Sequence, residues 1–174
     1  MVESVLGGVE KGVNPIYYEV TSYGADLDVE GIVQRMKRGD IFIPPFQRNF
    51  VWNISQSSRF IESLLLGLPV LGIFLAQEQE TNKFLVIDGH QRLKTLLFFY
   101  EGIFLSQEKK QQVFKLLGQN IVDKYKGLRY KDLSGKDKRI LDHSIIHATV
   151  VKLAFSSDNE TSIYHRIFER LQML

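Results

Sequence analysis

The sequence predicts an α+β domain in which a small mixed β-sheet is flanked by helices. Phe84–Ile87 is a short apolar run with polar residues on both sides, which is typical of a buried strand. From Leu93 to Tyr100, apolar residues recur with the spacing of one helix face. Ile145–Phe155 is apolar and rich in β-branched residues, which favours another strand far along the chain. Because helical segments separate these strands, we expect helices to flank the sheet.

The first predicted elements are a strand and a helix. Tyr17–Thr21 alternates enough for a strand. Ala25–Asp28 leads into a helix that continues through about Lys37, and Gly39 ends it. The buried side of this helix would be formed by Leu27, Ile32, Val33 and Met36.

Residues 41–52 are expected to follow an extended path, because Pro44 and Pro45 are incompatible with a helix interior. Ser55 is placed to cap the next helix, and Gly67 ends it. The apolar residues on one side of this helix are Phe60, Ile61, Leu64 and Leu65.

A β-hairpin is expected in the middle of the chain. Val70–Ala76 has the pattern of a strand, and the polar segment Gln77–Lys83 joins it to Phe84–Ile87. The central helix then continues to about Tyr100.

Two helices and one strand are predicted in the C-terminal part. Gln107–Leu117 predicts a helix, and Ser134 is placed to cap another over Asp137–His143. After the strand Ile145–Phe155, a last helix is expected over Asp158–Leu171. Its inward side would be formed by Ile163, Ile167, Phe168 and Leu171.

The composition fits a globular protein of 174 residues and excludes several classes of function. We expect residues 1–16, which are glycine-rich and patternless, to be a flexible arm, and residues 17–174 to form a single domain. The net charge of +2 is too small to require a nucleic-acid partner. The absence of cysteine excludes disulfides, thiolate metal sites and a cysteine nucleophile, and fits the reducing cytoplasm, where we expect the protein. No apolar run reaches the roughly 18 residues of a membrane span.

Several motifs of common enzymes are absent. The sequence contains no P-loop, no Gly-x-Gly-x-x-Gly, no His-Glu-x-x-His and no Gly-x-Ser-x-Gly. The four histidines are scattered. His143 and His147 are four residues apart, but the predicted junction between a helix and a strand separates them, which disfavours a metal site built on this pair.

The polar residues between the central strand and the central helix form a candidate binding site. Asp88, Gly89, His90, Gln91 and Arg92 stand where a strand runs through a tight turn into a helix. The N-terminus of a helix carries unpaired N–H groups and the positive end of the helix dipole, so it favours anions. Asp88 is placed as the N-cap, and Arg92 can share a face with it. The motif predicts a phosphate or nucleotide site; the structural alternative is that Asp88 caps, Gly89 turns and Arg92 pairs with Asp88.

Gln47 and Arg48 form a second polar pair, inside a stiff and aromatic stretch. They follow Phe46 and precede Phe50 and Trp52, and the prolines before them restrict the backbone. An arginine in such a stretch is positioned by its surroundings. In the structural alternative, Arg48 stacks on Trp52 or Phe50 and closes an edge of the core, a contact worth about 0.5–2 kcal/mol.

Basic residues and tyrosines are interleaved between Lys124 and Arg139. Such a combination suits a nucleic-acid backbone, although a solvated lysine-rich loop is the interpretation that we favour. The candidate nucleic-acid contacts are Lys124, Lys126, Arg129 and Lys131.

Two segments together, Pro45–Trp52 and Val86–Leu93, resemble a known family. They are similar to the N-terminal domain of GmrSD-type modification-dependent restriction proteins, which belongs to the ParB/sulfiredoxin-like superfamily. The helix Phe60–Pro69 also fits, and Ile163–Leu171 is similar to the family's phenylalanine-glutamate-arginine motif. The family's central motif usually reads Asp-Gly-Gln-Gln-Arg, and His90 stands here at the first glutamine.

The resemblance implies a ParB/sulfiredoxin-like fold and a domain that binds and hydrolyses a nucleoside triphosphate. In such proteins this activity gates the cleavage of foreign, often modified DNA, and the nuclease is a further domain or a partner subunit. We therefore expect the chain to be part of a longer protein that contacts DNA as a whole. A homo-oligomer is one option for its assembly, and the sequence leaves the oligomeric state open.

Resemblance and chemistry together assign roles to the two motifs. Arg92 and Arg48 would clamp phosphate oxygens with a bidentate geometry that lysine cannot match. Asp88 would orient a water molecule or hold Mg²⁺. The candidate catalytic residues are Asp88, His90, Gln91 and Arg92, and the candidate nucleotide-binding residues are Gln47, Arg48, Gly89 and Arg92. Gln47 would contact the base or the ribose, and His90 adds a group that titrates near neutral pH.

Two other classes of function stay open at this point. The domain would be a non-hydrolysing, ParB-like switch if it bound a nucleotide or DNA without turnover. It would be a structural interaction module if the polar motifs only capped and paired. The redox chemistry of sulfiredoxins is excluded, because the chain has no cysteine.

Overall fold

A computed structural model of the chain describes residues 20–153 and 160–173, which form the α+β fold that the sequence predicts. The elements are, in order, β1 (Val20–Asp28), α1 (Val29–Arg38), β2 (Ile41–Phe42), α2 (Ile54–Leu65), β3 (Ile73–Gln77), β4 (Phe84–Asp88), α3 (His90–Glu101), β5 (Ile103–Leu105), β6 (Gln111–Val113), the 3-10 helix η1 (Tyr130–Asp132), α4 (Gly135–Asp142), β7 (Ile145–Leu153) and α5 (Glu160–Gln172).

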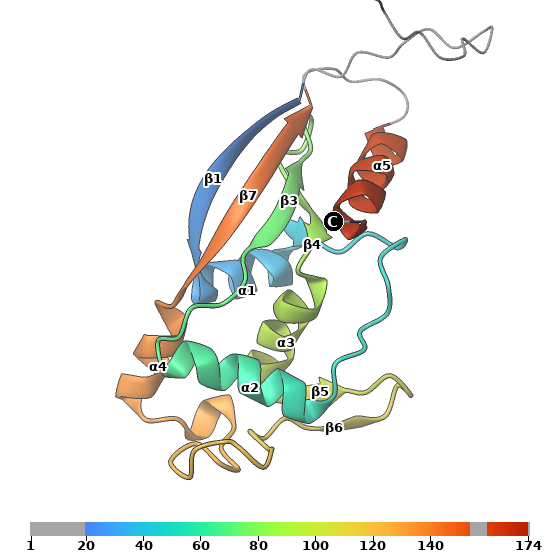
Figure 1. Ribbon diagram of the computed structural model, residues 1–174. Helices are drawn as coiled ribbons and strands as arrows, with labels where there is room; N and C mark the ends of the chain where they lie inside the picture. Colours follow the sequence, from blue (N-terminus) through green and yellow to red (C-terminus); the bar gives the residue numbers. More distant parts are fainter. Residues whose placement is uncertain (1–19, 154–159, 174) are drawn as a thin grey trace, which may run out of the picture.

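Five strands form a mixed sheet in the order β1-β7-β3-β4-β2 (Figure 1). The long outer strands β1 and β7 run antiparallel, whereas β3 runs parallel to β7. The predicted hairpin is present, because β3 and β4 pair antiparallel. The short strand β2 runs parallel to β4 and pairs with Phe84 and Leu85 only. The sheet is therefore mixed, as predicted.

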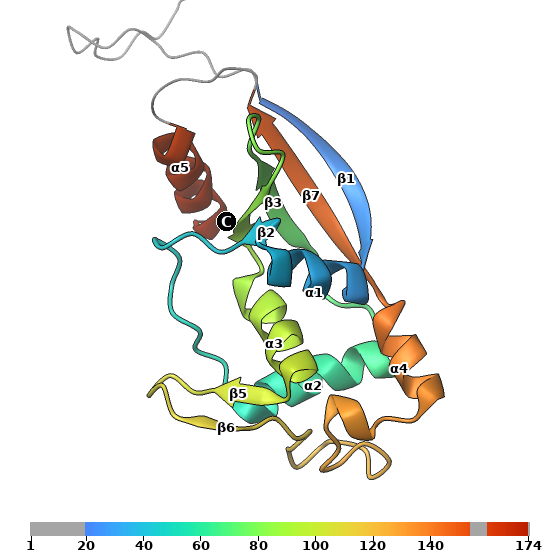
Figure 2. The same ribbon diagram turned by 180° about the vertical axis from the view of Figure 1, so that it is seen from behind.

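The main core lies between one face of the sheet and the helices α1, α2 and α3. Alternate residues of β4 point to opposite faces: Val86 belongs to this core, whereas Leu85 and Ile87 belong to a second cluster. The second cluster contains the apolar side of α5, with Ile167 and Phe168. In both views α5 lies beside β4 and apart from the other helices (Figure 2). Helices thus cover both faces of the sheet, and β4 carries contacts from each.

The boundary between the first strand and the first helix differs from the prediction. Ala25–Asp28 belongs to β1 and not to a helix, so Leu27 is a strand residue. Asp28 is the N-cap of α1, and its carboxylate accepts a hydrogen bond from the N–H of Gly31 at 2.6 Å. Because Asp28 continues the long ladder with β7 in an extended conformation, the helix cannot begin before Val29.

Ser55, the predicted cap of α2, lies inside the helix. Asn53 is the cap, and it forms a reciprocal capping box with Gln56. The Asn53 side chain accepts from the N–H of Gln56 at 2.9 Å, and the Gln56 side chain accepts from the N–H of Asn53 at 2.9 Å. An asparagine followed by glutamine three residues later therefore outcompetes the serine.

The predicted helix Gln107–Leu117 is wrong. The strands β5 and β6 form an antiparallel hairpin there, through a turn in which Lys109 has a φ of 57°. After β6, Phe114 and Leu116 are fully buried while Lys115 is exposed, which is the period of extended chain. The predicted cap of α4 by Ser134 is correct.

Some predictions lie outside the described residues: the arm over residues 1–16, the start of the first strand and the segment 154–159. In the two described ranges, no helix has the length and apolar character that crossing a membrane requires.

Candidate functional site

The central motif begins at a helix start that no side chain of the described residues caps. Gly89 precedes α3 with φ 99° and ψ 10°, in the left-handed region that glycine tolerates best. A Cβ on Gly89 would also lie 2.5 Å from Cγ2 of Ile73, so a side chain has no room there. The prediction that Asp88 caps α3 is wrong, because Asp88 ends β4 and its carboxylate turns to Arg92. The N-terminal N–H groups of α3 are thus left to a ligand or to water.

Gln91 connects the central motif to the other polar motif. Its Oε1 accepts hydrogen bonds from the N–H groups of Val51 at 2.9 Å and Trp52 at 3.2 Å. Its Nε2 donates to the carbonyl of Asn49 at 3.1 Å. These partners belong to residues 43–53, the proline loop, which runs from β2 to α2 past the end of α5 (Figures 1 and 2). Gln91 therefore fastens the proline loop to the start of α3.

Gln47 makes a second connection between the two motifs. Here a side chain of the proline loop bonds the backbone of β4. Its side chain is only 8% exposed, and its Nε2 donates to the carbonyls of Val86 at 2.8 Å and Ile87 at 2.9 Å. These carbonyls lie beyond the two β4 residues that β2 pairs. Because two carbonyls fix the amide orientation, Oε1 is the free atom, and it has no hydrogen-bond partner among the described residues.

Arg92 is the most enclosed charged residue of the central motif. Its side chain is 14% exposed, and Nη2 donates to the carbonyl of Gly72 at 2.9 Å and to Oδ2 of Asp88 at 3.1 Å. Its Nε is buried and unpartnered. In the part of the chain that the structure describes, the buried side-chain nitrogen or oxygen atoms without a partner are this Nε and Oε1 of Gln47, one in each motif.

Asp88 and Arg92 line a cavity of about 440 Å³ that we call the sheet-face cleft. It also reaches across β3, β7 and β1, and its polar or glycine lining is formed by Gly24, Asp26, Gly72, Asp88, Arg92, His147 and Thr149. Among the described residues, Gln47 and Arg48 do not line this cleft. Asp26 carries no local sequence signal that would place it in the site, because only the pairing of β1 with β7 brings it there.

His90 occupies the first turn of α3 beside the proline loop. Its Nε2 lies 2.8 Å from Nε2 of Gln91. The amide orientation assigned from the Gln91 network makes the Gln91 nitrogen a donor, so the imidazole nitrogen must accept and the ring is neutral. Burial first, and then the positive charge of Lys94, lower the pKa of His90 below its usual value.

Arg48 is exposed and makes no hydrogen bond or ion pair with the described residues. The alternative in which it stacks on an aromatic neighbour is not observed. Trp52 contacts Phe60 and Phe50 contacts Phe98, both edge to face. The Arg48 guanidinium is therefore an exposed cation on the proline loop, one residue after Gln47.

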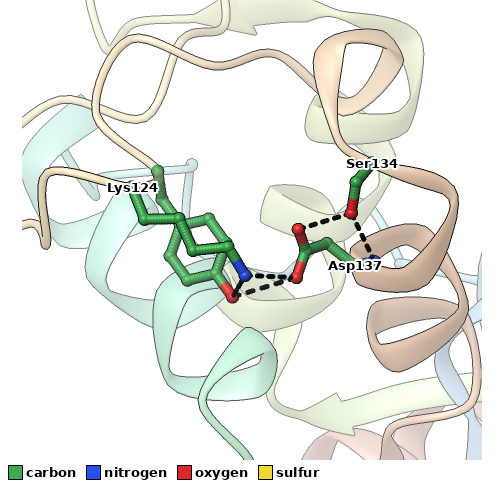
Figure 3. Close-up of polar contacts among 4 residues, drawn as sticks. Lys124, Ser134 and Asp137 are labelled. Atoms are coloured by element: carbon green, nitrogen blue, oxygen red, sulfur yellow. Dashed lines mark hydrogen bonds and ion pairs between the residues drawn. The ribbon is translucent and has the colours of Figure 1, made fainter.

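In the basic segment Lys124–Arg139, two of the four candidate basic residues pair with aspartates of the same segment. Asp137 is only 4% exposed and accepts from Lys124 at 2.8 Å, Tyr125 at 3.2 Å and Ser134 at 2.6 Å (Figure 3). Hydrogen bonds from Lys124 first, and then from Ser134, lower the pKa of Asp137. Lys124 therefore has a structural role at the start of α4.

Arg129 also has a structural partner. It binds Asp132 through two parallel bonds, Nε to Oδ2 at 2.6 Å and Nη2 to Oδ1 at 2.9 Å, which lower the pKa of Asp132 to about 2. The ammonium groups of Lys126 and Lys131 have no partner among the described residues. A nucleic-acid contact of this segment stays a prediction that rests on these two lysines.

The described residues contain no group of three or more His, Cys, Asp or Glu side chains that could hold a metal ion. His143 follows α4 and His147 lies in β7, so the junction predicted between them is present. Asp88 is 41% exposed and is the single carboxylate of the central motif. Mg²⁺ commonly takes one or two carboxylates and completes its shell with phosphate and water. Asp88 alone could supply the single carboxylate of such a site.

Comparison with known proteins adds a family. Residues 29–173 match the family described as GmrSD restriction endonuclease, N-terminal domain. An uncharacterised protein of Methanocaldococcus jannaschii is 32% identical over a stretch that covers 38% of this chain and 16% of that protein. The chain thus corresponds to a small part of this relative. No solved structure matches the chain, so the ParB/sulfiredoxin-like fold stays a prediction.

Proposed function

The chain belongs to the family of GmrSD restriction endonuclease N-terminal domains, and on that premise we propose that its two polar motifs bind and hydrolyse a nucleoside triphosphate. The turnover would gate the cleavage of foreign, often modified DNA by a nuclease in a further domain or subunit. The site is the start of α3 together with the proline loop, which Gln91 fastens to α3 and Gln47 fastens to the end of β4.

The observation that carries the proposal is the pair of unpartnered buried atoms. Leaving a buried donor or acceptor unpaired costs about 1–3 kcal/mol, so such atoms are rare in folded proteins. Here the donor is Nε of Arg92 and the acceptor is Oε1 of Gln47. A nucleotide that reached these buried atoms would offer partners for both, with phosphate oxygens that accept and ribose or base groups that donate.

The start of α3 suits the phosphates. An uncapped helix N-terminus presents N–H groups and partial positive charge, and Gly89 supplies the left-handed turn that sets α3 in this position. Arg92 adds a guanidinium held by Gly72 and Asp88 within the first turn, and Arg48 adds an exposed one from the proline loop. Two arginines can grip a phosphate chain from different sides.

Hydrolysis of the β–γ phosphoanhydride bond needs mainly positioning and charge neutralisation, and less covalent chemistry from the protein. Asp88 accepts from Arg92 through Oδ2 and is partly exposed, so it can orient a water molecule or hold Mg²⁺. When bound, Mg²⁺ would supply further neutralisation of phosphate charge. Neutral His90 would act as a hydrogen-bonding group next to the phosphates.

The test is calorimetric titration of the protein with ATP, GTP, CTP and UTP in the presence of Mg²⁺, with each monophosphate as control. We expect at least one triphosphate to bind, and to bind more tightly than its monophosphate, because the phosphate chain makes the main contacts. Phosphate release measured on the same samples separates hydrolysis from a non-hydrolysing switch. Failure of all four triphosphates to bind would contradict the proposal.

A further inference from the structure

Asp26 and His147 form a pair in the sheet-face cleft that the two motifs do not explain. Nδ1 of His147 lies 2.5 Å from Oδ1 of Asp26, 121 residues away in the sequence. The antiparallel register of β1 and β7 sets these residues directly opposite each other. Both line the cleft that also contains Asp88 and Arg92.

The backbone between this pair and Arg92 is closely packed. Gly72 accepts a hydrogen bond from Arg92, and a Cβ on Gly72 would lie only 2.6 Å from the carbonyl oxygen of His147. Only glycine therefore allows β7 and the segment before β3 to approach this closely. Gly72 therefore contacts both the His147 backbone and the Arg92 guanidinium.

The contact with Asp26 prepares the imidazole for proton transfer. A carboxylate at Nδ1 holds the proton on that nitrogen, so Nε2 presents a lone pair. Nε2 has no partner among the described residues. A base whose second nitrogen is held by a carboxylate is the arrangement that activates water or a hydroxyl group in hydrolases.

We propose that His147 accepts the proton of the attacking water in the sheet-face cleft and that Asp26 is its positioning residue. This inference rests on the proposed hydrolysis of a nucleoside triphosphate. The water oxygen forms a bond to the γ-phosphorus as the bond to the β–γ bridging oxygen breaks. The proton of the water moves to Nε2, and the diphosphate leaves with the electron pair of the broken bond. Asp26 stabilises the resulting imidazolium, which returns the proton to solvent.

The charged groups around His147 fit this role. Asp26 on β1 pairs with it, and Asp88 at the end of β4 and Arg92 on α3 line the same cleft. Arg92 can hold the γ-phosphate while the carboxylates favour the imidazolium. The cleft thus joins an anion-binding group to a proton acceptor.

Substitution separates proton transfer from binding. For His147→Gln we expect triphosphate affinity within about twofold of wild type and turnover reduced about 10²–10⁴-fold, the usual contribution of a general base. His143→Gln is the matched control, because His143 is exposed, lies four residues earlier and does not line the cleft. Asp26→Asn should lower kcat while triphosphate affinity stays within about twofold of wild type, because the ring loses its positioning carboxylate. Unchanged turnover in His147→Gln overturns the inference.

Histidine NMR on the wild-type protein distinguishes the failure of this inference from failure of the proposed function. On addition of a triphosphate with Mg²⁺, the ring signals of His147 should move while those of His143 stay. Binding of the triphosphate with no movement at His147 overturns the inference and leaves the nucleotide site in place. If no triphosphate binds, the proposed function fails and this inference fails with it.

Discussion

Oε1 of Gln91 lies 2.9 Å from the backbone nitrogen of Val51, 40 residues earlier in the chain. Together with the bonds from Gln47 to Val86 and Ile87, this contact makes the two polar motifs one structural unit. A substitution in either motif should therefore alter the position or stability of the other.

Replacing Gln91 by alanine should loosen the proline loop. The variant loses three hydrogen bonds to Asn49, Val51 and Trp52, so we expect the free energy of unfolding to fall by about 1–3 kcal/mol. Urea denaturation measures this loss. Gln107→Ala is a suitable control, because Gln107 also bonds the loop but through one exposed contact, to the Val51 carbonyl. An equal effect of the two variants would argue against Gln91 as the main fastening.

His90 should make the protein less stable in mild acid. Its pKa is lowered in the fold, so the unfolded chain takes up the proton first as pH falls through the ordinary value of 6.5. The free energy of unfolding should therefore decrease from pH 6.5 down to the folded pKa. His90→Gln should remove this decrease, whereas His143→Gln should keep it. Urea denaturation at several pH values between 5 and 7.5 checks this, and equal slopes for wild type and His90→Gln would contradict it.

Protonation of His90 also determines the pH range in which nucleotide affinity should change. Because the neutral ring accepts from Gln91, a cationic ring must give up that bond. Any gain in triphosphate affinity from the imidazolium should therefore appear only below pH 6.5, the ordinary pKa of histidine. Calorimetry over the same pH range in the wild type and in His90→Gln measures the difference.

Asp137 should stabilise the segment before α4 at neutral pH. Asp137→Asn weakens the bonds from Lys124 and Ser134 at a buried position, at a cost of about 2–3 kcal/mol. Because the pKa of Asp137 is depressed, its contribution is complete above the ordinary value of 3.8 and is lost as pH falls through the folded pKa. The stability difference from wild type should therefore shrink below pH 4. Asp123→Asn, at an exposed position, should show neither effect.

Most of the fold could be predicted, because a helix or strand that buries one face has apolar residues at regular spacing in the sequence. The hairpin around residues 77–83 and the helix after Gly89 are examples. The error at Gln107–Leu117 came from a turn at Lys109, whose positive φ has no local signal in a non-glycine residue. The alternation of apolar Phe114 and Leu116 with basic Lys115 is nevertheless a sequence pattern that indicates extended chain.

Less of the site than of the fold could be predicted from the sequence. Nothing local distinguishes a glutamine that binds a ligand from one that satisfies backbone groups, and Gln91 bonds three backbone groups of a distant loop. Asp26 and His147 meet only through the register of β1 and β7, which long-range packing sets. The polar motifs could be found by residue type, but their partners required the fold.

Arg92→Ala tests the central claim, that the start of α3 holds the phosphates of a nucleotide. The paired measurement is the melting temperature and the affinity for the triphosphate that wild type binds best. The account predicts at least about a 100-fold loss of affinity, equal to about 2.8 kcal/mol, with cooperative unfolding retained. Arg38→Ala, which removes an exposed arginine paired to Asp40, should leave affinity unchanged. Unchanged affinity in Arg92→Ala together with a lowered melting temperature would contradict the account, because the motif would then serve only to pair Asp88 and Gly72 with Arg92.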